Sequence, residues 1–123
     1  MLYQRENILE IKVENLTNRI IKLVAYLKAK HANAKIIDQI SRSGLSIGAN
    51  TCEAKYAQSK KDFASKLSIA LKEANETKFW IRKLHHAQVL NDIEFESIHN
   101  DADEIVAILF SIVKTLKQQA GNE

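Results

Sequence analysis

The stretch that most restricts how this chain can fold is residues 41–57, which combines helical periodicity with two glycines. Gly44 and Gly48 each weaken a helix by roughly 1 kcal/mol relative to alanine, so we interpret them as positions where another helix comes close. Two rows of residues repeat through this region at steps of three and four. The apolar or small row is Ile37, Ile40, Gly44, Ile47, Thr51 and Ala54, and the polar row is Gln39, Ser43, Ser46, Asn50 and Glu53. A helix that carries both rows is expected to have two different neighbours.

The same spacing predicts four long helices, at about residues 7–30, 34–56, 60–86 and 92–118. The apolar rows of the other three helices are Leu9, Val13, Leu16, Ile20, Leu23 and Leu27; Phe63, Leu67, Ala70, Ala74, Thr77, Ile81 and Leu84; and Ile98, Ala102, Ile105, Leu109, Ile112 and Leu116. Long helices joined by short turns predict an all-α, antiparallel up-down-up-down four-helix bundle. The length of 123 residues fits one domain over residues 1–123.

Polar residues predict where each helix begins. Asn7, Asn33, Ser59 and Asn91 are expected N-caps, because their side chains can accept hydrogen bonds from the first free backbone N–H groups. Gly121 is expected to lie in a frayed tail beyond the last helix.

Composition narrows the function classes. The chain has no proline, three glycines, one cysteine and a net charge of +3. A single cysteine excludes an internal disulfide and fits a reducing compartment. The first ten residues lack the pattern of a signal peptide, and no apolar run approaches the ~20 residues of a membrane span. We therefore expect a cytoplasmic protein that does not associate with membranes.

The third predicted helix has a second row that contains Glu73, Glu76 and Trp80. Two interpretations are open. Glu73 and Glu76 share a helix face and could form an acid–base pair. Alternatively, the polar rows form a hydrogen-bonded network or a subunit interface, whose members would be Arg42, Ser46, Asn50, Glu53, Glu73, Glu76 and Trp80. We favour the network and predict no catalytic residues, because no His, Cys, Ser or Lys arrangement beside the acids completes a nucleophilic site.

Metal and cofactor binding are not expected. Di-metal sites in four-helix bundles need Glu-x-x-His on two helices and a Glu on each of the other two. Here the motif occurs once, as Glu96-x-x-His99. Cys52 is expected to be a small packing residue.

A run of basic residues without acids crosses the first predicted turn. It comprises Arg19, Lys22, Lys28, Lys30 and Lys35. Repeated around an oligomer, such a rim could bind RNA through its phosphates. Aromatic residues are not interleaved with the run, so base stacking is not predicted there.

Two segments resemble a known family. They are residues 39–44, 46–50 and 53–54 in the second helix, and residues 61–63, 66–67, 69–74, 76–77 and Trp80 in the third. They are similar to the four-helix-bundle family of the 23S ribosomal RNA intervening-sequence protein and, more distantly, to the accessory variability protein of diversity-generating retroelements. The resemblance covers about half of the chain and implies a homopentamer without known catalysis.

The second and third helices carry more inward-facing rows than one bundle needs. We therefore predict a non-enzymatic oligomeric scaffold whose partner is another copy of itself. The alternative is an RNA-binding protein that uses the basic rim.

Overall fold

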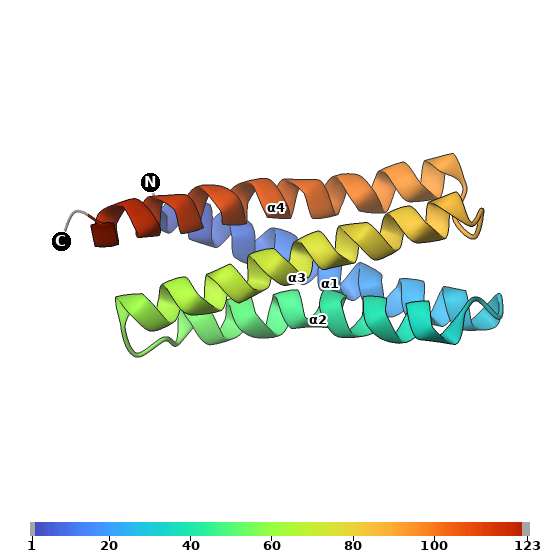
Figure 1. Cartoon of the computed structure of the whole chain (residues 1–123), viewed down its shortest axis with the longest axis horizontal. Helices are drawn as coiled ribbons and strands as arrows, with labels where there is room; N and C mark the ends of the chain where they lie inside the picture. Colours follow the sequence, from blue (N-terminus) through green and yellow to red (C-terminus); the bar gives the residue numbers. More distant parts are fainter. Residues whose placement is uncertain (1, 122–123) are drawn as a thin grey trace.

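Four helices make up the computed structural model, which describes residues 2–121, with side chains from Asn7 onward. The helices are α1 (Leu2–Ala29), α2 (Ala34–Lys55), α3 (Lys60–His86) and α4 (Asp92–Gly121), and the described residues contain no strand (Figure 1). The all-α, four-helix fold class is therefore confirmed. Met1 and residues 122–123, which the predicted domain includes, lie outside the described residues.

Each helix runs along most of the length of the molecule. The α1–α2 and α3–α4 turns lie at one end, and the α2–α3 turn lies at the opposite end, where the chain also begins and finishes (Figure 1). α2 packs against α1 and α3, and α4 packs against α3 and α1. None of the described helices combines the length and the hydropathy that a membrane span requires.

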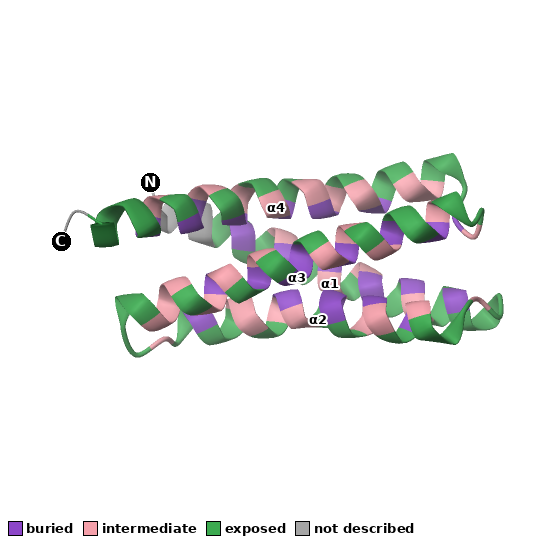
Figure 2. Ribbon diagram, viewed as in Figure 1, coloured by how far each residue is buried: buried purple, intermediate pink, exposed green. Residues whose placement is uncertain are grey.

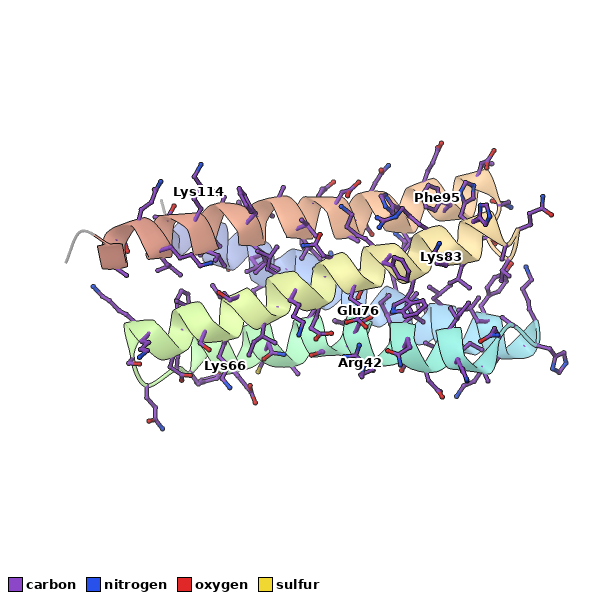
Figure 3. All side chains as sticks on the ribbon, in the orientation of Figure 1. Arg42, Lys66, Glu76, Lys83, Phe95 and Lys114 are labelled. Carbon is purple, nitrogen blue, oxygen red and sulfur yellow. The ribbon has the colours of Figure 1, made fainter. Side chains whose placement is uncertain are left out.

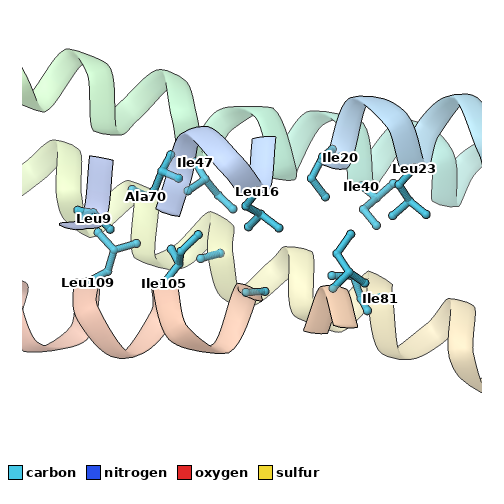
Figure 4. Close-up of a cluster of buried hydrophobic side chains, with 14 of the residues drawn as sticks. Leu9, Leu16, Ile20, Leu23, Ile40, Ile47, Ala70, Ile81, Ile105 and Leu109 are labelled. Carbon is cyan, nitrogen blue, oxygen red and sulfur yellow. The ribbon is translucent and has the colours of Figure 1, made fainter. Parts of the chain in front are cut away.

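The core is built from the predicted apolar rows of all four helices. Leu16 of α1, Ile40 and Ile47 of α2, Ile81 of α3 and Ile105 of α4 are all 0% exposed. Their side chains meet between the helices (Figure 4), and the buried stripe on each helix faces its neighbours (Figure 2). Sequence periodicity therefore located the core, because residues three and four apart share a helix face.

Two residues of the predicted rows near the α2–α3 turn are not fully buried. Thr51 of α2 and Phe63 of α3 are only half-buried. Both lie within the two helix turns nearest the end of the molecule, where a row has fewer neighbours to cover it.

Three expected N-caps are present. Asn33 accepts hydrogen bonds from the N–H groups of Lys35 (2.9 Å) and Ile36 (3.1 Å). Ser59 accepts one from Asp62, and Asn91 accepts one from Glu94. Each α-helix from α2 onward therefore begins where its capping residue predicts.

The first helix start and the last helix end differ from prediction. α1 begins at Leu2, so Asn7 lies inside the helix and is not its cap. α4 continues to Gly121, so the predicted end at residue 118 and the tail were also wrong. Residues 2–6 contain no glycine or proline that would stop α1, and a glycine in the last helical turn disturbs few hydrogen bonds.

The two turns at one end of the bundle share a backbone form. His31 (φ 57°) and Gln88 (φ 62°) adopt the left-handed conformation. After α1, the N–H of Ala32 bonds to the carbonyl of Leu27 (3.0 Å), and after α3 the N–H of Val89 bonds to the carbonyl of Leu84 (2.9 Å). These are Schellman motifs, in which glycine is the usual left-handed residue.

Candidate functional site: a polar cluster between α2 and α3

Arg42 of α2 lies opposite two carboxylates of α3. Its Nη1 donates to Glu73 Oε2 at 3.0 Å, and its Nη2 donates to Glu76 Oε1. Figure 3 shows Arg42 and Glu76 pointing toward one another across the contact between the two helices. One guanidinium reaches both acids because Glu73 and Glu76 are three residues apart on one helix face.

Two further side chains complete this group. Gln39 Oε1 accepts from Arg42 Nε at 3.4 Å, and Trp80 Nε1 donates to Glu76 Oε1 at 3.4 Å. We call Gln39, Arg42, Glu73, Glu76 and Trp80 the Arg42 cluster. It lies within one chain and connects α2 to α3.

Electrostatics favour the charged forms of Glu76 and Arg42. The pKa of Glu76 is lowered, first by the hydrogen bond from Arg42 and further by that from Trp80, while burial opposes the shift. The hydrogen bond to Glu76 in turn raises the pKa of Arg42. A general acid at neutral pH needs a raised carboxyl pKa, so Glu76 is poorly suited to that role.

A hydroxyl pair lies beneath the Arg42 cluster. The Oγ atoms of Ser43 and Thr77 are 3.0 Å apart, and both residues are 0% exposed. Thr77 Oγ1 is also 2.8 Å from the backbone carbonyl of Glu73. Ser43 belongs to the predicted polar row of α2, and Thr77 belongs to the predicted apolar row of α3. The only sequence signal for their contact was a small hydroxyl residue in each of these rows.

The remaining residues of the predicted network lie apart from the Arg42 cluster. Asn50 Nδ2 donates to the backbone carbonyl of Ser46 at 2.9 Å and lies 3.0 Å from its hydroxyl, so both groups are satisfied on α2. Glu53 forms an ion pair with Lys66 of α3 at 3.2 Å. The structure therefore joins Arg42, Glu73, Glu76 and Trp80, but not Ser46, Asn50 or Glu53.

The two glycines of α2 face α1. A Cβ built on Gly44 would lie 2.8 Å from Ile20 Cγ2, and one on Gly48 would lie 2.9 Å from Thr17 Cγ2. Both distances are shorter than ordinary van der Waals contact. These residues therefore allow close packing of α1 on α2, on the side of α2 away from the Arg42 cluster.

Two residues of the predicted basic rim have partners within the chain, and the other three have no salt bridge among the described residues. Arg19 pairs with Asp101 of α4 at 2.6 Å, and Lys30 donates to the carbonyl of Val89 at 2.9 Å. The other three rim residues, Lys22, Lys28 and Lys35, are exposed and have no salt bridge within the part of the chain that is described.

A second polar group, which sequence analysis missed, lies between α3 and α4. Asp103 pairs with Lys78 Nζ at 2.6 Å and with His99 Nδ1 at 3.2 Å. The Phe95 ring stacks on His85 (centroids 4.1 Å apart) and lies 4.8 Å from His99. Burial lowers the pKa of His99, and Lys78 lowers that of Asp103. The group joins side chains of two helices, and the spacing of residues along the sequence does not indicate which side chains of different helices meet.

No group of three or more His, Cys, Asp or Glu side chains among the described residues could hold a metal ion. Cys52 is exposed, so the expectation that it packs was wrong. It lies on the outward face of α2, four residues before Tyr56, which is 74% exposed.

The fold and the cluster define an all-α protein of four long helices whose α2–α3 contact is held by an ionic group. The chain belongs to the 23S rRNA-intervening sequence protein family, whose model matches residues 5–111. It is 42% identical to a protein of unknown function from the S23 ribosomal protein family of Bacteroides thetaiotaomicron, whose crystal structure superposes with a TM-score of 0.85. That match covers 89% of this chain and 98% of the other. No curated protein sequence matches significantly.

Proposed function

We propose that the protein is a non-enzymatic scaffold that assembles from up-down-up-down bundles, in the homopentamer that the family resemblance implies. The observation that carries the proposal is an exposed row that runs along the outward face of α2 and ends at its C-cap residue. Its members are Leu45, Ala49, Cys52 and Tyr56, at steps of four, three and four. Leu45 is 39% exposed and Tyr56 is 74% exposed. Apolar and small residues at this spacing are typical of helices that pack along another helix.

This row replaces the polar rows as the proposed contact between copies. The Arg42 cluster is satisfied inside one chain, so its groups are not free to bind another copy. The row from Leu45 to Tyr56 has no such role within the chain. The absence of a raised carboxyl pKa at Glu76 supports a structural assignment over an acid–base one.

Charge substitutions on this row test the proposal. Leu45→Glu and Tyr56→Glu should lower the molar mass measured by light scattering after size-exclusion chromatography, because a buried unpaired carboxylate opposes association. Ile93→Glu is the matched control, since Ile93 is 81% exposed in the first turn of α4. Equal masses for all three variants and the parent protein would remove this face from the assembly.

RNA binding through the basic rim is the second candidate. Lys22, Lys28 and Lys35 support it, because their side chains are exposed around the α1–α2 turn. The rim is smaller than predicted, since Arg19 and Lys30 are committed to other groups of the same chain. We also propose a cytoplasmic location, which the free thiol of Cys52 supports.

A further inference from the structure

None of the exposed residues of α3 is acidic. Its ten exposed residues are Lys60, Lys61, Ser65, Ile69, Lys72, Asn75, Phe79, Arg82, Lys83 and His86. Five of the ten are Lys or Arg. The three acids of α3 point elsewhere: Asp62 lies near the helix start, and Glu73 and Glu76 belong to the Arg42 cluster. We call these ten residues the α3 cationic face.

The other helices have balanced surfaces. The exposed residues of α1 from Asn7 include two acids and two lysines, and those of α2 include two acids and three basic residues. The exposed residues of α4 include three acids and two lysines. The net charge of +3 is therefore concentrated on the α3 cationic face.

Three lysines of this face are aligned. Lys61, Lys72 and Lys83 are eleven residues apart, which is close to three helical turns. At 1.5 Å rise per residue they stand about 16 Å apart along one line, which spans about 33 Å. None of them, nor Arg82, forms a salt bridge among the described residues. A straight line of cations without salt bridges matches a linear polyanion.

An aromatic ring lies within the line of cations. Phe79 is 40% exposed and packs edge-on against Trp80, with ring centroids 4.9 Å apart. Lys83 Nζ lies over the ring, 5.2 Å from its centroid (Figure 3 labels Lys83 on α3). Aromatic rings beside cations are the combination that binds bases and phosphates of unpaired strands.

We propose that the α3 cationic face binds single-stranded nucleic acid. Phosphates lie along Lys61, Lys72 and Lys83, while one base packs on Phe79 and the Lys83 ammonium moves from the ring to a neighbouring phosphate. An anionic membrane surface fits less well, because only Ile69 (38% exposed) and Phe79 offer apolar area for insertion. The proposal does not depend on self-assembly, although an oligomer would repeat the face in every copy.

Fluorescence anisotropy tests the proposal with labelled 20-nucleotide RNA and DNA of one pyrimidine sequence, titrated with the full chain at several salt concentrations. Binding by three to five cations predicts a log–log salt slope of about −2 to −3.5. Lys72→Glu/Lys83→Glu should weaken binding at least tenfold and flatten the slope, and Phe79→Ala should weaken it about fivefold or more. Tighter binding of RNA than of DNA would assign the ligand to RNA, and equal binding would assign it to single strands in general.

The matched control is Lys114→Glu/Lys117→Glu, which reverses two exposed lysines of α4 that belong neither to the α3 cationic face nor to the basic rim. It should bind like the parent protein. Equal loss in the two double variants, or unchanged binding by Lys72→Glu/Lys83→Glu, would overturn the proposal. So would binding to vesicles of anionic phospholipid without binding to either oligonucleotide. The molar mass of each variant, measured in the same samples, shows whether a loss of binding accompanies a loss of assembly. Circular dichroism verifies that each variant is folded.

Discussion

At the scale of single residues, Gly44 shows how a poor helix former can stabilise a bundle. Its lack of a side chain allows Ile20, which is 0% exposed, to approach the α2 backbone. The gain from close packing of α1 on α2 then exceeds the cost of about 1 kcal/mol for glycine in a helix.

Gly44→Ala is therefore expected to destabilise the protein by about 1–3 kcal/mol, although alanine favours helix. The added Cβ would lie 2.8 Å from Ile20 Cγ2, and a buried side chain cannot move aside without displacing its neighbours. Urea unfolding followed by circular dichroism measures the change. Gly121→Ala is the control, since nothing lies within 4 Å of the added atom, and a Gly44→Ala protein as stable as the parent would contradict this account.

His31→Gly and Gln88→Gly are each expected to stabilise the protein by about 0.5–1 kcal/mol, because a left-handed backbone is costly for a residue with a Cβ. Thermal unfolding would show this as a higher midpoint. Ala25→Gly, at an exposed position inside α1, should lower the midpoint. A lower midpoint for both turn variants would mean that the His31 and Gln88 side chains stabilise the protein by more than their left-handed backbone conformations destabilise it.

At the scale of helices, the contact between α2 and α3 depends on charge pairing inside the chain. The Glu73 side chain is 10% exposed and that of Arg42 is 49% exposed. Loss of the arginine would leave Glu73 as a nearly buried carboxylate without its cation, which costs more than the pair contributes when intact.

Arg42→Met should therefore destabilise the protein by about 1–3 kcal/mol, and adding Glu73→Gln should recover part of the loss. A double-mutant cycle from urea unfolding measures the coupling. Glu53→Gln is the control, because the Glu53–Lys66 pair is exposed and should contribute less than about 1 kcal/mol. Additive effects of Arg42→Met and Glu73→Gln would show that the two side chains do not interact.

The contact between α3 and α4 predicts a pH dependence. Burial lowers the pKa of His99, so the unfolded chain binds this proton more readily than the folded one. Stability is therefore complete above the unfolded value of about 6.5 and falls as the pH drops below it. Asp103 opposes the loss, while Lys78 and Arg82 add to it.

The unfolding free energy should thus decrease between pH 7.5 and pH 5.5, a range above the ordinary pKa values of Glu76 and Asp103. His99→Gln should show a smaller decrease, whereas His86→Gln, at an exposed position of α3, should behave like the parent protein. An identical decrease in all three proteins would assign the effect to other groups.

Sequence periodicity was sufficient to predict the helices and the core, because both depend on which residues share a helix face. Which residues meet across a contact depends on how far one helix slides along another. Spacing therefore placed Glu73 and Glu76 together, but it did not separate Ser46, Asn50 and Glu53 from them. It also did not reveal the contact of His99 with Asp103 and Lys78.

At the scale of the whole molecule, the two proposed binding surfaces lie on different helices. α2 presents the row from Leu45 to Tyr56, which we propose as the contact between copies. α3 presents the α3 cationic face, which we propose as a nucleic-acid surface. Since these surfaces lie on different helices, one assembly can use both.

We propose that copies of the chain cover one another, and sedimentation equilibrium over micromolar concentrations measures whether they do. We expect a mass that is a multiple of 14.0 kDa, five times that value for the proposed pentamer. A stable particle of 14.0 kDa throughout the concentration range would contradict it.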